Sequence, residues 1–98
     1  MTNAAGTPIH ARTIVEDDSV VAEIAKQCTL NQRFEELWDG WKWRLARDPI
    51  SDSVEIDGQQ GARLVKSDPR NVAYGLPTLT LVYTYDENEV VVLRMRIT

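Results

Sequence analysis

Two stretches of alternating residues near the C-terminus constrain the fold more than any other feature of this chain. Between Thr78 and Tyr85, and again between Val90 and Ile97, apolar or aromatic side chains recur at every second position. A period of two residues is that of a β-strand with one buried face. The polar segment Asp86–Glu89 between them is typical of a turn. We therefore predict an antiparallel hairpin with strands at 78–85 and 90–97.

The alternation also divides the predicted hairpin into two faces. The face that we expect to be buried carries Leu79, Leu81, Tyr83, Tyr85, Val91, Leu93, Met95 and Ile97. The opposite face carries Thr80, Val82, Thr84, Val90, Val92, Arg94 and Arg96.

Two helices are predicted before the strands. Asp17, Asp18 and Ser19 offer N-cap side chains, and apolar residues then recur at helical spacing as far as Cys28. A second helix is predicted at 30–47, where Thr29 and Gln32 have the spacing of a capping box. Its apolar stripe consists of Leu30, Phe34, Leu37, Trp38, Trp41 and Leu45. Asp48–Pro49 is expected to end it.

The remaining segments complete the order of elements. Short strands are predicted at 9–15, 53–57 and 62–66, with a turn at 58–61 and a long loop at 67–77. The resulting fold class is α+β in the order β-α-α-β-β-β. We expect the two N-terminal helices to pack on one face of a small, mainly antiparallel sheet. Residues 1–8 are predicted to be a flexible tail, and residues 9–98 a single domain.

Composition excludes several classes of function. The chain has 98 residues and a formal net charge of −4, which argues against strong nonspecific nucleic-acid binding. Its single cysteine and single histidine argue against an internal disulfide and a Cys/His zinc site. No apolar run approaches the ~18 residues of a membrane span, and no signal peptide is predicted. We expect a cytoplasmic protein with no membrane association, no metal and no cofactor.

Arginines on the predicted open face of the sheet are the sharpest polar signal. Arg94 and Arg96 stand two residues apart on one strand, so both point the same way. We expect Arg63 to share their face, and Lys66 to add a weaker contact because alternation sends it to the face opposite Arg63. Such a patch suits a phosphate backbone or an acidic partner. The alternative is a solvated face whose cations pair with nearby acids.

Other residues allow more than one interpretation. Trp43 lies off the helical stripe with Arg47 four residues further on, which predicts either a cation–π pair or an exposed partner contact. Cys28 is expected to pack against the core, and His10 to have a structural or solvent-facing role.

The order of elements and four local patterns resemble the RelE/ParE superfamily of type II toxin–antitoxin toxins, the family of plasmid stabilisation proteins. The patterns are Trp43–Pro49, Gly61–Val65, Leu79–Asp86 and Val90–Arg94, and the resemblance spans roughly residues 9–97. It implies two helices on a curved antiparallel sheet and a cognate antitoxin that holds the toxin inactive. RelE-like members cleave messenger RNA on the ribosome through basic and aromatic residues of the open sheet face. ParE-like members inhibit DNA gyrase.

The pair Leu93–Arg94 is closer to ParE-like sequences, and Thr80 stands where RelE-like members have an arginine. In addition, Tyr83 and Tyr85 alternate onto the predicted core face, which leaves few groups for proton transfer on the open face. We therefore expect a toxin-like protein that binds its target. The alternatives are a ribosome-dependent mRNA endonuclease and a non-toxic interaction module or decayed toxin. A homodimer is compatible with all three.

Overall fold

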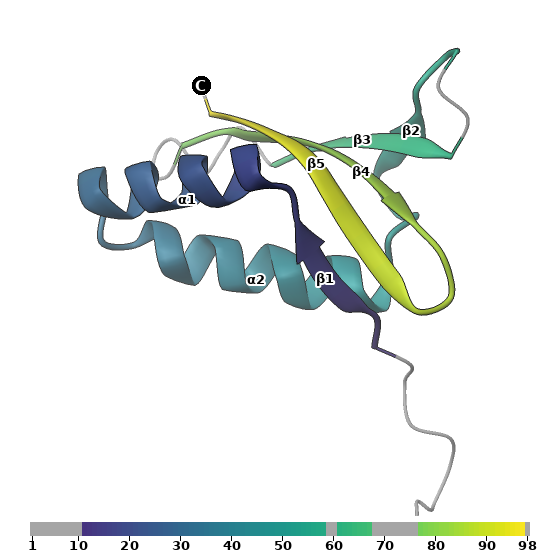
Figure 1. The fold of residues 1–98 in the computed structure, drawn as a ribbon, viewed down its shortest axis with the longest axis horizontal. Coiled ribbons are helices and arrows are strands. Elements are labelled where there is room, and N and C mark those ends of the chain that lie inside the picture. Colours follow the sequence, from purple (N-terminus) through teal and green to yellow (C-terminus); the bar gives the residue numbers. More distant parts are fainter. Residues whose placement is uncertain (1–10, 59–60, 68–76, 98) are drawn as a thin grey trace, which may run out of the picture.

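The computed structural model describes residues 11–58, 61–67 and 77–97 (Figure 1). The predicted tail at 1–8, His10 and most of the predicted loop at 67–77 lie outside these residues. The elements in chain order are β1 (Thr13–Glu16), α1 (Asp18–Leu30), α2 (Phe34–Arg47), β2 (Ser53–Glu55), β3 (Ala62–Lys66), β4 (Leu79–Tyr85) and β5 (Glu89–Ile97).

The strands form one mixed sheet in the order β1-β5-β4-β3-β2. The β4–β5, β3–β4 and β2–β3 pairs are antiparallel, whereas β1 runs parallel to β5. Both helices pack on the same side of this sheet (Figure 1). The predicted α+β class is thereby confirmed, with one strand before the two helices and the other strands after them. Four strands follow α2, one more than the predicted order β-α-α-β-β-β counts, and β3 has the bounds predicted for it. No helix among the described residues is long and apolar enough to cross a membrane.

The boundary between the helices differs from the prediction. Asp17 caps α1 as expected, because its side chain accepts a hydrogen bond from the Ser19 amide. The predicted capping box at Thr29 and Gln32 is wrong: Thr29 lies in the last turn of α1, and its hydroxyl donates to the Ala25 carbonyl at 3.0 Å. α2 begins only at Phe34, without a side-chain cap. Threonine can bond either forward as a cap or backward within a helix, and its spacing alone does not choose between them.

The core lies between the helices and the middle strands. α1 contributes Val20, and α2 contributes Phe34, Trp38, Trp41 and Leu45. The sheet contributes Val65, Leu79, Leu81, Tyr83, Val90 and Val92. Each large apolar side chain buried in this way stabilises the fold by about 1.5–3 kcal/mol. The prediction that Trp38 and Trp41 are core residues is confirmed, since they are 3% and 8% exposed.

A β-bulge in β5 corrects the predicted faces of the hairpin. Tyr83 pairs with Val92 and Val82 pairs with Arg94, so Leu93 has no partner in the register. One inserted residue reverses the alternation. Val90 and Val92, predicted to face outward, are therefore fully buried, while Met95 and Ile97 beyond the bulge pack against the core as predicted.

Candidate binding face

The helix-free side of the sheet, which we call the open face, carries three of the basic residues predicted to bind a partner. Arg94 pairs with Val82, and Val82 pairs with Leu64, so these side chains form one row across three strands. Arg96 pairs with Thr80, and Thr80 pairs with Lys66. Paired residues on neighbouring strands share a face. Arg94, Arg96 and Lys66, all of them exposed, therefore lie on the open face together.

Arg63 does not belong to this group, and the prediction that it does is wrong. It pairs with Tyr83, a core residue, so its side chain leaves the sheet on the helix side. There its Nε donates to the Ser53 hydroxyl at 2.7 Å and one terminal nitrogen donates to the Ser53 carbonyl at 3.1 Å. Its other terminal nitrogen lies 3.6 Å from a Glu55 oxygen. Lys66, which alternation puts opposite Arg63, takes its place beside Arg94 and Arg96.

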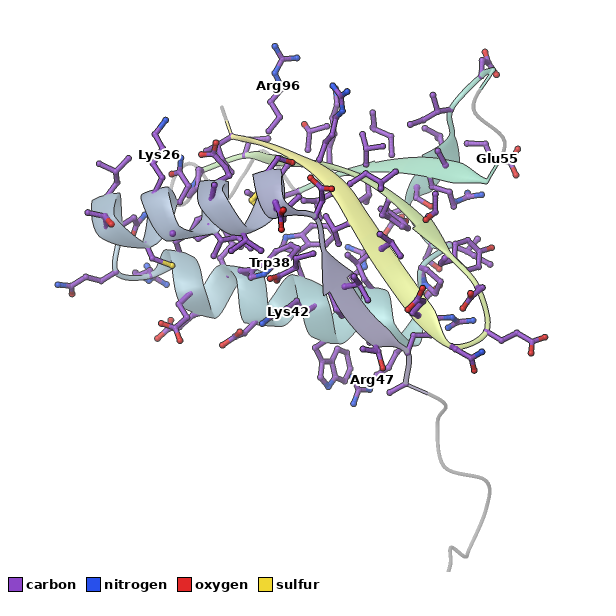
Figure 2. The ribbon with its side chains drawn as sticks, in the orientation of Figure 1. Lys26, Trp38, Lys42, Arg47, Glu55 and Arg96 are labelled. Carbon is purple, nitrogen blue, oxygen red and sulfur yellow. The ribbon has the colours of Figure 1, made fainter. Side chains whose placement is uncertain are left out.

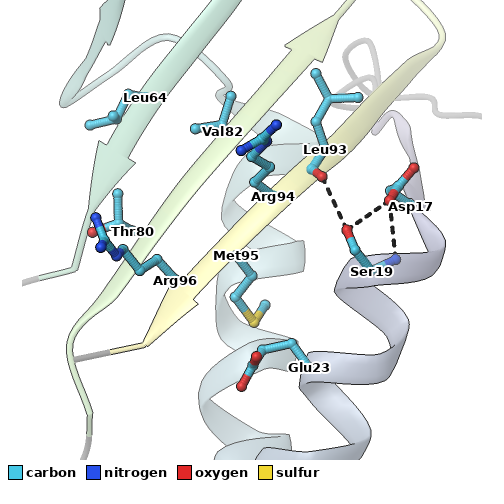
Figure 3. A pocket seen from close by; sticks show the side chains of 10 residues that line it. All are labelled: Asp17, Ser19, Glu23, Leu64, Thr80, Val82, Leu93, Arg94, Met95 and Arg96. Carbon is cyan, nitrogen blue, oxygen red and sulfur yellow. Dashed lines mark hydrogen bonds between the residues drawn. The ribbon is translucent and has the colours of Figure 1, made fainter.

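A groove of about 890 Å³ lies against the open face (Figure 3). β3, β4 and β5 provide its floor, and the first turns of α1 provide one wall. Its lining residues are Asp17, Ser19, Glu23, Leu64, Thr80, Val82, Leu93, Arg94, Met95 and Arg96. The mixture of apolar floor and charged groups suits an amphipathic ligand.

The acids of the groove are held by α1 itself. Asp17 accepts hydrogen bonds from the Ser19 hydroxyl at 2.7 Å and the Ser19 amide at 3.1 Å (Figure 3). These two bonds, the hydroxyl first, lower the pKa of the Asp17 carboxyl below its ordinary value of 3.8, and the charge of Arg94 adds a smaller effect. Glu23 accepts a hydrogen bond of 2.8 Å from the Gln27 side chain.

The arginines of the groove, by contrast, have no such partners. Neither Arg94 nor Arg96 makes a hydrogen bond or an ion pair with another described residue. A guanidinium presents five donors in a planar fork, so both side chains are available to an anion from outside.

The start of α1 and the bulge are parts of the site that sequence reasoning missed. The Ser19 hydroxyl lies 3.5 Å from the Leu93 carbonyl oxygen, so the N-terminal turn of α1 sits against the bulge. The N-cap motif at Asp17 indicates where α1 begins. It does not indicate which strand α1 begins beside.

Trp43 and Arg47 form the cation–π pair predicted for them. The Arg47 guanidinium carbon lies 4.4 Å from the centroid of the Trp43 ring, and the guanidinium also donates to the Trp43 carbonyl at 3.1 Å. Trp43 remains 62% exposed. Arg47 lies below α2 in Figure 2, whereas Arg96 points away above the sheet. This pair is therefore a surface separate from the groove.

The tyrosines of β4 are on the helix side of the sheet. Tyr83 is fully buried and its hydroxyl donates to the Pro49 carbonyl. Burial raises the pKa of Tyr83 above its ordinary value of 10.0. Tyr85 is half-buried beneath the Arg12 guanidinium, whose carbon is 5.6 Å from the ring centroid. Neither phenol can act on a ligand in the groove.

No group of three or more His, Cys, Asp and Glu residues suited to a metal ion occurs among the described residues. Cys28 is partly buried and packs against the core, as predicted.

No protein-family model, curated protein or solved structure matches this chain. What the open face does is therefore inferred from its own residues.

Proposed function

We propose that this chain is the toxin-like component of a toxin–antitoxin pair, which acts by binding a target and is neutralised by a cognate antitoxin protein in the cytoplasm. The observation that carries the proposal is the pair Arg94 and Arg96: both are exposed, both line the groove on the helix-free face, and neither makes a hydrogen bond or an ion pair with another described residue. The element order, one strand, two helices and then four strands paired antiparallel, supports the RelE/ParE-like assignment at the level of fold alone.

Binding fits the open face better than RNA cleavage does. Cleavage without a metal needs a base for the 2′-hydroxyl, an acid for the leaving oxygen and cations for the phosphorane. The face supplies cations. The Tyr83 hydroxyl is buried on the other side, and the lowered pKa of Asp17 makes that carboxylate a weak base. A ParE-like mode of action, by inhibition of a target such as gyrase, is accordingly preferred to a ribosome-dependent endonuclease.

The chemistry of the partner follows from the charges. Arg94, Arg96 and Lys66 would contact acidic groups, and each charge-assisted hydrogen bond to them contributes roughly 1.5–3 kcal/mol to binding. The chain as a whole carries a net charge of −4, so its attraction for an acidic partner must come from this local patch.

Induced expression in a bacterial host tests the proposal. We expect growth arrest that is relieved by co-expression of the product of the adjacent reading frame. If the target binds the open face, Arg94→Ala/Arg96→Ala should no longer arrest growth. If the antitoxin binds this face, the double variant should still arrest growth, but co-expression of the antitoxin should no longer relieve the arrest. Lys42→Ala/Arg47→Ala removes the same charge from α2 and should change neither. Normal growth at high soluble yield of the wild-type protein would instead indicate a non-toxic interaction module.

The mode of action is read in the same cells. Primer extension on cellular messages should show no new cleavage sites, and plasmid DNA should show altered supercoiling if gyrase is the target. Ribosome-dependent cleavage that survives in Arg94→Ala/Arg96→Ala would contradict the assignment of this face.

A further inference from the structure

The side of α2 that faces away from the core carries one exposed tryptophan and a set of charged residues. Trp43 is 62% exposed. At about 3.6 residues per turn, Glu36, Asp39, Gly40 and Arg47 all lie within about 60° of it around the helix axis. We call these residues, together with Trp43, the outer face. Glu36, Asp39 and Gly40 are exposed as well, so no other described element covers this face.

Gly40 is not explained by the packing of the single chain. Glycine is less favourable than alanine in a helix interior. A Cβ atom at this position would have nothing within 4 Å apart from the backbone of its own helix, so no described neighbour requires a glycine here. An open hollow of about 280 Å³ lies beside it instead, lined by Glu36, Leu37, Gly40, Trp41 and Arg44. A glycine that faces open space lets another backbone or ring come close to the helix.

The charges along α2 are arranged symmetrically about the midpoint between Trp41 and Lys42. Acidic residues occupy the half before this midpoint and basic residues the half after it. The pairs at equal distances from the midpoint are Glu36 with Arg47, Asp39 with Arg44, and Gly40 with Trp43. In a two-fold symmetric pair of antiparallel helices, residues related in this way lie level with each other. Each of these acids in one copy would therefore lie level with a base in the other.

We propose that the outer face binds a second copy of this chain, with the two α2 helices antiparallel about this midpoint. The Trp43 ring of each copy lies over Gly40 of the other copy and enters the hollow beside it. Glu36 of each copy meets Arg47 of the other at both ends of the interface. This inference goes beyond the proposed function and does not depend on it.

The side chains of the outer face are available for these contacts. Glu36 makes no hydrogen bond or ion pair with another described residue. The Arg47 guanidinium carbon lies 4.4 Å from the Trp43 ring centroid of its own chain, which holds the two groups at one place on the surface. The level pair of Asp39 and Arg44 contributes less, because each already has an ion-pair partner in its own chain.

Charge complementarity favours a second copy over an unrelated partner. The symmetric pair makes each charge contact twice, with residues that this chain already carries. A single helix face buries less than the roughly 1,200 Å² at the lower end of stable interfaces, so we expect a reversible dimer with a dissociation constant on the order of 100 µM. Arg47 lies below α2 and Arg96 above the sheet in Figure 2, so both open faces of the dimer remain free.

Sedimentation of the wild-type chain from about 1 µM to about 1 mM tests the inference. We expect a monomer at the lowest concentrations and a dimer at the highest. Trp43→Ala should weaken this self-association by about tenfold or more. A wild-type chain that is still monomeric at about 1 mM would overturn the inference. A dimer whose affinity is unchanged in Trp43→Ala would use another surface, and would overturn it equally.

Charge reversal tests the antiparallel register. Glu36→Lys alone and Arg47→Glu alone should each weaken self-association by about tenfold or more, because each places like charges level with one another at both ends. An equimolar mixture of the two variants should associate about as well as the wild type, since every lysine or arginine then meets a glutamate. A mixture that associates no better than either variant alone would contradict the proposed pairing.

Glu35→Lys is the matched control for charge. It makes the same change of net charge at an exposed neighbour that lies about 100° around the helix from Glu36. We expect it to change self-association by less than about twofold, and its mixture with Arg47→Glu to show no recovery. Equal effects of Glu35→Lys and Glu36→Lys would mean that net charge governs association, and the register would be wrong.

Gly40→Leu separates the close approach of the helices from folding. Leucine favours a helix, and its Cβ has space in the single chain, so the midpoint of urea unfolding should not fall. The larger side chain would keep the Trp43 ring of the second copy away from the helix, and self-association should weaken by about tenfold or more. Unchanged self-association in a folded Gly40→Leu variant would rule out the contact between ring and glycine.

Discussion

The indole nitrogen of Trp38 donates a hydrogen bond to the Glu16 carboxylate at 2.7 Å. Glu16 is the last residue of β1, and Trp38 lies in the middle of α2. The bond therefore fixes the point at which β1 ends over the helix layer. Trp38 is only 3% exposed, so its N–H has little access to water and depends on this partner.

Removing the acceptor should destabilise the protein. We expect Glu16→Ala to lower the free energy of unfolding by about 1–3 kcal/mol, because the indole N–H would stay buried without a partner. Glu16→Gln keeps an acceptor oxygen and should cost less than about 1 kcal/mol. Urea unfolding followed by tryptophan fluorescence measures both. Equal losses in the two variants would show that the charge of Glu16 matters and the hydrogen bond does not.

Tyr83 should make stability fall at high pH. Its pKa is raised above 10.0 by burial, so the unfolded chain loses the phenol proton before the folded one does. The stabilisation is complete below pH 10 and declines as the pH rises toward the raised pKa. Unfolding by urea between pH 8 and 11 should show this decline. Tyr83→Phe should show a smaller decline, after an initial loss of about 0.5–1.5 kcal/mol for one hydrogen bond, because the Pro49 carbonyl still accepts from the Ser53 hydroxyl at 3.3 Å.

Deleting Leu93 should remove the bulge and leave the sheet register intact. Without it, Val92 and Arg94 would follow one another in regular alternation, each opposite the β4 residue that it faces now. The cost should be no more than about 2 kcal/mol, for one partly buried leucine. Deleting Met95 is the control, since it would turn Arg96 toward the core and should cost more than about 3 kcal/mol. Comparable losses in both deletions would contradict this account of the bulge.

The tryptophans of α2 should respond differently to truncation. Trp41→Ala removes a ring that is 8% exposed and should cost about 3–5 kcal/mol. Trp43→Ala removes a ring that is 62% exposed and contacts Arg47, and it should cost less than about 1 kcal/mol. Urea unfolding compares the two. A loss above 2 kcal/mol in Trp43→Ala would mean that this ring is packed more tightly than its exposure indicates.

Local periodicity was sufficient to predict the helices and strands themselves. The apolar stripe of α2 from Phe34 to Leu45, the bounds of β3 and the hairpin of β4 and β5 follow from spacing within one segment, because a side chain's place on a helix or strand repeats every 3.6 or 2 residues. Leu30, predicted to begin that stripe, instead ends α1 and is 71% exposed. The open arginines were predicted for the same reason: Arg94 and Arg96 share a face whatever their strand pairs with.

The relations between elements were decided by tertiary structure. Nothing in the residues 13–16 indicates that they run parallel to β5, since that pairing joins segments more than seventy residues apart. The bulge at Leu93 and the exchange of Arg63 for Lys66 have one physical cause. Alternation divides the side chains of a strand between two faces, but it does not indicate which face is buried. A shift of one residue exchanges the two faces. The elements packed against each strand decide which face is buried. Arg63 is paired with Tyr83, whose hydroxyl donates to the Pro49 carbonyl on the helix side, and the start of α1 lies against the bulge at Leu93.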